Sequence, residues 1–78
     1  MTGNLGDIDN EFGKVLKKRR IRRGVSQEKL AKDSNLTRSY ISQLENGNKD
    51  PSLFTIVKLS QALKIKPSVF IDEVEHAF

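Results

Sequence analysis

The fold is decided by residues 24–47, which read GVSQEKLAKDSNLTRSYISQLENG. Ser26 is the expected N-cap of a short helix that ends near Ser34, and Thr37 is the expected N-cap of the next helix. An apolar residue precedes each cap and pairs with another inside the helix, as in a hydrophobic staple. Asn35 suits the left-handed backbone that a tight turn requires. The stretch therefore predicts two capped helices joined by a turn.

The second of these helices has two distinct faces. Ile41 and Leu44 are expected to point inward, which leaves polar residues facing outward: Arg38, Ser39, Ser42 and Gln43. A short helix, a turn and a helix with a polar outer face describe a helix-turn-helix, whose second helix enters the major groove of DNA. Small helical domains also place polar residues outward without binding DNA, so this pattern leaves both interpretations open.

A longer helix is predicted before this stretch. It begins near Asp7, which is a suitable N-cap, and ends at about Arg23, where Gly24 can stop it. One face of this helix is apolar, through Ile8, Phe12, Val15 and Leu16.

Two further helices are predicted after it. Residues 46–52 form a turn, and either Asp50 or Ser52 caps a fourth helix, with Pro51 tolerated in its first turn. Its periodic apolar residues are Leu53, Ile56, Val57, Leu59, Ala62 and Leu63. Ser68 is the expected cap of a fifth helix at about 68–78, with a broad apolar stripe of Val69, Phe70, Ile71, Val74, Ala77 and Phe78. We expect Val69 and Phe70 to close over the core.

Length and composition limit the alternatives. A chain of 78 residues has room for one small core, and the absence of Cys excludes disulfides and thiolate metal sites. We predict an all-α, single-domain protein over residues 7–78, preceded by a flexible segment at 1–6. No apolar stretch approaches the roughly 20 residues that span a bilayer, and residues 1–20 do not resemble a signal peptide, so we expect a cytoplasmic protein without a membrane partner.

Charge is unevenly distributed along the chain. Residues 13–66 hold all 14 Lys and Arg but only four acidic residues; 14 minus four gives this segment a charge of +10, against +4 for the whole chain. A basic body indicates a polyanion partner, most often nucleic acid, although many basic proteins have none. The basic run at 17–23 is also explained as a solvated face that suits the C-terminal end of its helix.

Catalysis has little support in the sequence. His76 is the only histidine and lies near the end of the chain, so no His-based acid–base pair, nucleophile relay or metal cluster can be assembled around it. The glycines at 24 and 47 suit helix ends and match no phosphate-binding loop. We expect a protein that is not an enzyme and that uses no cofactor and no metal.

Specific motifs then indicate a family. The stretch 24–31, the stretch 36–47 and Asp-Pro-Ser-Leu at 50–53 closely resemble the phage repressor/Cro-type helix-turn-helix family, over about residues 12–74. Within it the chain looks most like stand-alone members such as restriction–modification controller proteins, which share the Arg-x-Tyr-Ile-Ser pattern at 38–42. The resemblance implies a compact five-helix lambda-repressor-like domain. It also implies a homodimer that binds a (pseudo)palindromic operator in double-stranded DNA and regulates transcription, for example as a repressor.

The resemblance also assigns roles in base recognition. It implies that Arg38, Ser39 and Gln43 read bases, with Ser42 and Tyr40 in supporting contact. Arg is suited to guanine and Gln to adenine, each through two hydrogen bonds. Arg also pairs well with phosphate. Tyr40 either packs against a thymine methyl group or sugar edge, or serves as half-buried filler.

Phosphate contacts and a structural ion pair are implied in the same way. The implied phosphate-binding residues lie at helix ends and in the turn after the third helix: Ser26, Gln27, Thr37, Asn46, Lys49 and Ser52. Capping and turn formation are the alternative roles of several of these. Arg20 and Glu45 match positions that form an ion pair between the first and third helices, and loss of one partner should reduce stability.

The fifth helix is the expected dimer interface. A monomer of this size would expose Ile71, Val74 and Phe78, which a second copy can cover. The alternative is a protein-interaction module, similar to an antitoxin, that grips a protein partner with this helix and binds DNA only secondarily.

Overall fold

The structure, a computed structural model, describes residues 6–77 and contains five helices: α1 (Gly6–Arg23), α2 (Gln27–Ser34), α3 (Arg38–Glu45), α4 (Leu53–Ala62) and α5 (Pro67–Ala77). No strand occurs within these residues, so the all-α prediction is confirmed. Gly6 is the first residue of α1. The helix therefore starts before Asp7, and the predicted flexible segment is one residue too long; its remainder, like Phe78, lies outside the described residues.

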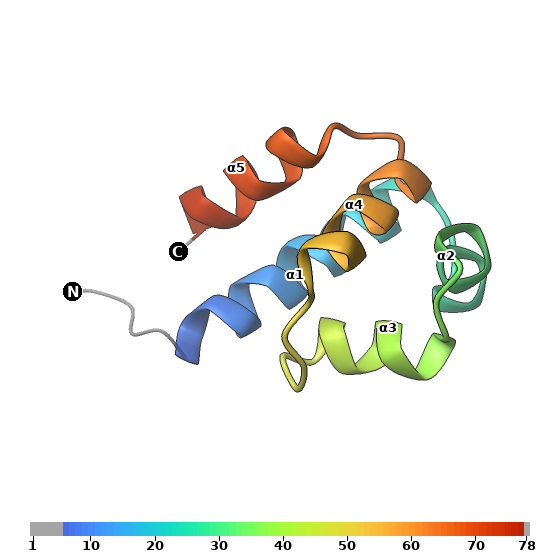
Figure 1. Ribbon diagram of the computed structural model, residues 1–78, viewed down its shortest axis with the longest axis horizontal. Coiled ribbons are helices and arrows are strands. Elements are labelled where there is room, and N and C mark those ends of the chain that lie inside the picture. Colours follow the sequence, from blue (N-terminus) through green and yellow to red (C-terminus); the bar gives the residue numbers. More distant parts are fainter. Residues whose placement is uncertain (1–5, 78) are drawn as a thin grey trace.

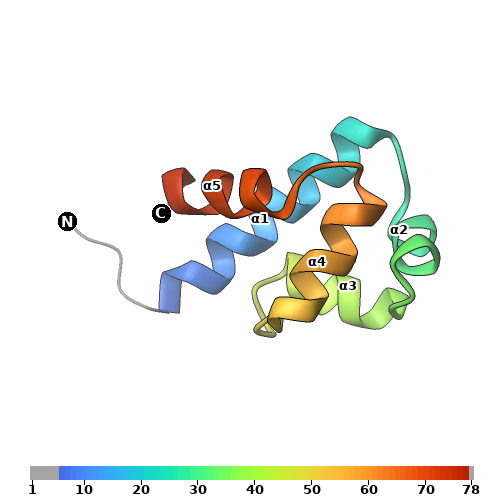
Figure 2. The same ribbon diagram turned by 45° about the horizontal axis from the view of Figure 1, so that its top comes forward.

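The helices enclose one core. α5 packs along α1, α3 packs directly against α1 and α2, and α4 contacts α2 and α5 (Figure 1). The start of α1 and the end of α5 lie at the same end of the molecule, and α2 lies at the opposite end (Figure 2). Apolar side chains from every helix are completely or almost completely buried: Leu16, Leu30, Ile41, Leu44, Leu59 and Phe70. None of the described helices combines the length and hydropathy needed to cross a membrane.

Three apolar residues that the periodicity assigns to the core are instead exposed. Ile8 is 37% exposed, Leu53 69% and Val69 41%, so these predictions are wrong. Each of the three lies within the first three residues of its helix. The 3.6-residue period identifies the face of a helix but not how far along it the neighbouring helices extend.

The structure selects one of the two predicted caps of α4 and moves the predicted start of α5. Ser52 caps α4, and its side chain accepts a hydrogen bond from the Thr55 amide, so Asp50 is not the cap and Pro51 lies outside the helix. α5 begins at Pro67, which places Ser68 inside the first turn rather than at the cap. Proline suits the first helical position because its φ is already helical and its missing N–H would have no acceptor there.

Gly13 allows α1 to approach the end of α3 closely. A Cβ atom at this position would lie 2.5 Å from the carbonyl oxygen of Leu44 and 2.6 Å from that of Glu45. Because both neighbours are backbone atoms, neither can move without shifting a helix.

We predict that Gly13→Ala lowers the free energy of unfolding by about 1–3 kcal/mol, because the strain outweighs the better helix propensity of alanine. Urea denaturation measures the change. Lys14→Ala, at an exposed position on the same helix, is the control and should be nearly neutral. Equal stability of the two variants would contradict the close approach of α1 and α3.

Two interactions hold α5 against α1. The rings of Phe12 and Phe70 stack with centroids 5.2 Å apart. Nearby, Arg19 Nε donates to Glu73 Oε1 at 2.6 Å. This hydrogen bond lowers the pKa of Glu73 from its ordinary value; burial opposes the shift, and the charges of Arg19, Arg22 and Lys18 reinforce it.

The lowered pKa of Glu73 predicts acid sensitivity. As pH falls below the ordinary glutamate value of 4.5, Glu73 is protonated first in the unfolded chain, so the unfolded state binds more protons and stability falls until the folded-state pKa is passed. Urea denaturation at a series of pH values should show a shallower acid slope for Glu73→Gln than for the natural chain. Glu75→Gln, at an exposed position on the same helix, is the control. If Glu73→Gln and Glu75→Gln reduce the acid slope of the free energy of unfolding by the same amount, the Arg19–Glu73 contact does not stabilise α5.

Candidate nucleic-acid interface

The turn between α1 and α2 is built from backbone hydrogen bonds and a left-handed glycine. Gly24 has φ +78°, and its amide donates to the Ile21 carbonyl at 2.9 Å, which ends α1 as predicted. Ser26 then caps α2, with its hydroxyl oxygen accepting from the Lys29 amide at 3.0 Å. Only residues 24–26 therefore separate α1 from α2.

The turn between α2 and α3 is equally short. Asn35 has φ 58°, and its amide donates to the carbonyl of Lys32 at 3.3 Å, in the left-handed conformation predicted for it. Thr37 caps α3, and its side chain accepts from the Tyr40 amide at 3.0 Å. With both turns so short, α3 is held close to α2 with little freedom (Figure 1).

α3 presents one face to the core and one to the outside. Ile41 and Leu44 are completely buried, which confirms the inward face. The opposite face carries polar residues that are exposed or partly exposed: Arg38, Ser39, Ser42 and Gln43. Within residues 6–77, the structure records no side-chain hydrogen bond or ion pair for Arg38. Its guanidinium therefore retains its donors for an external acceptor.

Tyr40 bridges α3 and the start of α4. Its ring is partly buried against the core, and its hydroxyl lies 3.4 Å from Thr55 Oγ1. Of the two roles left open, half-buried packing is present in the structure. The supporting contact to DNA stays a prediction.

Three capped helix starts carry free amides. The first N–H groups of any helix lack an intrahelical acceptor, and such groups attract anions. The caps of α2, α3 and α4 are Ser26, Thr37 and Ser52. The Ser52 hydroxyl, however, accepts from the Thr55 amide and also donates to Thr55 Oγ1 at 3.0 Å. Its hydrogen is therefore not free for a phosphate in this arrangement, and the amides of α4 are the better donors there.

The other residues assigned to phosphate lie at the surface. Asn46 ends α3, with its amide donating to the Ser42 carbonyl at 3.0 Å, and its side chain is exposed. Lys49 is exposed in the loop that follows.

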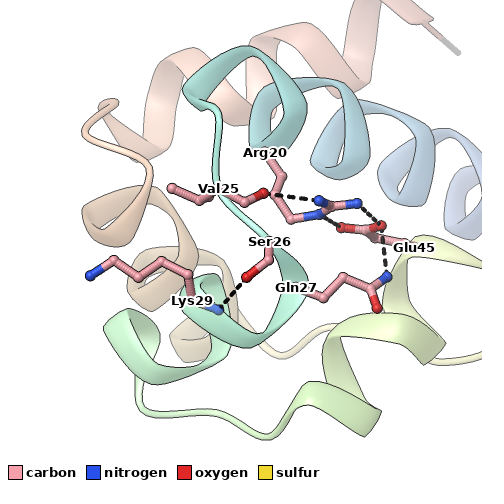
Figure 3. Close-up of polar contacts among 6 residues, drawn as sticks. All are labelled: Arg20, Val25, Ser26, Gln27, Lys29 and Glu45. Carbon is pink, nitrogen blue, oxygen red and sulfur yellow. Dashed lines mark hydrogen bonds and ion pairs between the residues drawn. The ribbon is translucent and has the colours of Figure 1, made fainter.

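A buried ion pair connects α1 to α3 beneath this surface (Figure 3). Arg20 Nε lies 2.6 Å from Glu45 Oε2, and Arg20 Nη2 lies 3.1 Å from Glu45 Oε1. The ion pair predicted between these residues is therefore present. The side chains are only 13% and 2% exposed. The hydrogen bond to Glu45 raises the pKa of Arg20 above its ordinary value, although burial opposes the change.

The same network reaches α2. Arg20 Nη1 donates to the Val25 carbonyl at 3.0 Å, and Gln27 Nε2 donates to Glu45 Oε1 at 3.1 Å. The sequence suggested a phosphate contact for Gln27 but not this internal bond. No local pattern could reveal it, because Gln27 and Glu45 are 18 positions apart.

An apolar groove lies away from α3. It has a volume of about 460 Å³ and is lined by residues of α1, α4, α5 and the loop before α4: Ile8, Phe12, Asp50, Pro51, Ile56, Ile71, Val74 and Glu75. Ile71 is 44% exposed and Val74 is partly buried. The sequence predicted two members of this surface, Ile71 and Val74, but not the groove. It also gave no signal for Phe54, which is 75% exposed.

Metal-binding groups are not gathered in the part of the chain that the structure describes. No group of three or more His, Asp or Glu residues lies close enough there to hold a metal ion. His76 is exposed, and its ring nitrogen lies 2.8 Å from the Asp72 carbonyl oxygen, one helical turn away.

Comparison with known proteins agrees with this geometry. A family model described as helix-turn-helix matches residues 16–70. The control protein C.BamHI of Bacillus amyloliquefaciens is 40% identical over 73 residues, which cover 92% of this chain and 86% of that protein. The crystal structure of the restriction-modification controller protein C.AhdI from Aeromonas hydrophila is 42% identical, with a TM-score of 0.78 over 80% of this chain and 94% of that one.

A third comparison includes DNA. The controller protein C.Esp1396I, solved as a tetramer in complex with its natural 35 base-pair operator, is 27% identical, with a TM-score of 0.83 over 96% of each chain. The matched residues include both capped helices and the turn between them. The chain therefore belongs to the helix-turn-helix family of DNA-binding transcription regulators.

Proposed function

We propose that the chain binds a two-fold symmetric operator as a homodimer, with α3 of each copy in the major groove, and thereby controls transcription. The outer face of α3 carries this proposal. There Arg38 and Ser39 are exposed while Ile41 and Leu44 anchor the opposite face in the core. The major groove of B-form DNA is wide enough for one such helix, and its base edges differ in their hydrogen-bonding groups.

Arg38 is the main base reader in this proposal. Its guanidinium can donate to both O6 and N7 of one guanine, which discriminates against other bases by about 1–3 kcal/mol. Ser39 and Gln43 read neighbouring bases, and Gln43 is suited to adenine through its amide. Ser42 and Tyr40 support these contacts from the same helix.

Phosphates are held on both sides of α3. The free amides at the start of α2, together with Ser26 and Gln27, take one phosphate, and Thr37 contributes at the start of α3. Asn46, Lys49 and the capped start of α4 at Ser52 take another. The charge of +10 on residues 13–66 favours this binding through the release of counterions from DNA.

The dimer is formed through α5. Ile71 and Val74 border an apolar groove whose burial by a second copy would remove exposed apolar surface from water. Phe78, which the sequence also assigns to the dimer interface, lies outside the described residues. A two-fold axis through it would set two recognition helices roughly 34 Å apart, one turn of DNA.

Relatives that are named control proteins support a role as a restriction–modification controller. The immunity repressor of Bacillus phage phi105, 36% identical over 61 residues, supports repression as one mode of action. Binding and regulation of this kind need no catalytic group and no cofactor, and they would take place in the cytoplasm.

Selection from a randomised pool of duplexes at fixed salt tests the proposal. We expect enrichment of a palindrome with half-sites about one helical turn apart, bound by two chains or by a multiple of two. The mass of the complex on the enriched duplex gives the number of chains. No enrichment, together with a protein partner that co-purifies at fixed stoichiometry, would contradict the proposal and favour a protein-interaction module.

Two substitutions separate base recognition from phosphate binding. Arg38→Ala should weaken binding to the enriched sequence by about 5- to 150-fold and abolish the preference at one base pair, whereas Lys49→Ala should weaken binding to all sequences and reduce the salt slope by about one. Affinities for the enriched duplex and a scrambled one, at several salt concentrations, provide the comparison. Lys14→Ala, on α1, is the control. Equal losses for Arg38→Ala on both duplexes would overturn its assigned role.

A further inference from the structure

The Glu45 carboxylate accepts a third hydrogen bond in addition to the two from Arg20. Arg20 alone supplies a donor to each oxygen, at 2.6 Å and 3.1 Å. Gln27 Nε2 nevertheless donates a further hydrogen bond to Oε1 at 3.1 Å. The Gln27 side chain is part-buried and could be hydrated instead, and holding it in one conformation costs side-chain entropy. This third contact helps to satisfy the buried carboxylate and at the same time holds the Gln27 side chain in one conformation.

The chemistry of the carboxylate determines how the Gln27 amide is oriented. An ionised carboxylate only accepts hydrogen bonds, so the amide must turn its nitrogen toward Glu45. One N–H is then used, and the second N–H and the carbonyl oxygen are left for other partners. In Figure 3 the Gln27 oxygen points away from Glu45.

Gln27 lies at the start of α2, where its oriented amide is next to free backbone amides. Gln27 is the first residue of α2, directly after the cap Ser26, whose oxygen is occupied by the Lys29 amide. The first-turn amides of α2 have no intrahelical acceptor. The fixed side-chain amide of Gln27 thus lies on the same turn as backbone donors that can hold an anion.

We propose that Glu45 is a positioning residue for DNA binding, which orders the Gln27 amide so that its second N–H joins the first-turn amides of α2 in holding one phosphate. This inference rests on the proposed function. The side chain is ordered before DNA arrives, so less conformational entropy is lost on binding. The Arg20–Glu45 pair thereby connects the packing of α1 against α3 to the phosphate contact of α2.

Hydrogen exchange in the free protein tests the ordering directly. The side-chain amide protons of Gln27 are followed by NMR, with those of Gln61, an exposed residue on α4, as the internal control. We expect one Gln27 proton to exchange at least several-fold more slowly than the Gln61 protons, and this protection to disappear in Glu45→Asp. That substitution keeps the charge but shortens the side chain. Equal exchange at Gln27 and Gln61 in the natural chain would overturn the proposal, whether or not any Glu45 variant folds.

A double-mutant cycle tests the consequence for DNA binding. On the enriched duplex at fixed salt, Gln27→Ala should weaken binding by about five- to tenfold in the natural background but by no more than about twofold in Glu45→Asp. A purely structural Glu45 would lower the melting temperature and leave the Gln27→Ala penalty unchanged, which would overturn the proposal. If Glu45→Asp does not fold, the exchange measurement and the single Gln27→Ala effect decide.

The outcomes of these experiments distinguish the proposed function from the positioning role of Glu45. If the natural chain selects no duplex, the proposed function fails and this inference fails with it. If the chain binds DNA and Arg38→Ala abolishes the preference at one base pair, but Gln27→Ala has no effect, the function stands and only the positioning role of Glu45 is overturned.

Discussion

The arrangement of the first three helices depends on the buried ion pair between Arg20 and Glu45. A charge that leaves water is costly unless its hydrogen-bonding capacity is satisfied, and the Glu45 side chain is 2% exposed. Three contacts meet this requirement, two from Arg20 and one from Gln27, while a further Arg20 N–H donates to the Val25 carbonyl. A shift of α1 against α3 would separate the two charges, and a shift of the first turn or of α2 would remove a hydrogen bond from one of them. The relative positions of α2 and α3, on which groove binding depends, follow from this constraint.

Hydroxyl caps serve two purposes in this molecule. Ser26, Thr37 and Ser52 each accept a hydrogen bond from an amide three residues ahead, which starts a helix at a defined residue. The same geometry leaves the first amides of each helix without acceptors, and the proposed binding of phosphate uses these amides. Local folding and the proposed DNA contacts therefore depend on the same few residues. Ser26 and Ser52 can each cap a helix and lie at a phosphate-binding helix start, so the two roles do not exclude each other. The structure separates them only at Ser52, whose hydroxyl hydrogen is held by Thr55.

Much of the fold could be predicted from the sequence because its signals are local. The caps at Ser26 and Thr37, the left-handed turn at Asn35 and the buried Ile41 and Leu44 follow from rules that act over a few residues. Predictions failed where the answer depended on distant neighbours. Ile8, Leu53 and Val69 have the right period for the core, but at the starts of their helices neighbouring elements cover them only in part. Ser68 resembles a cap, but the preceding Pro67 already begins the helix. The candidate site was predictable as the outer face of α3, because the apolar residues Ile41 and Leu44 identify the opposite, buried face.

The sequence by itself therefore determined the helix count, the turn chemistry and the family, because each is encoded in short runs of adjacent residues. Its motifs also assigned the Arg20–Glu45 pair, although only through resemblance, since two side chains 25 positions apart carry no local signal of contact. The tertiary structure alone decided that Gln27 joins this pair, that Tyr40 meets Thr55, and that Ile8 and Pro51 combine with α5 to form an apolar groove. Each of these depends on how helices cross, and the crossing is set by the shapes of all the buried side chains together.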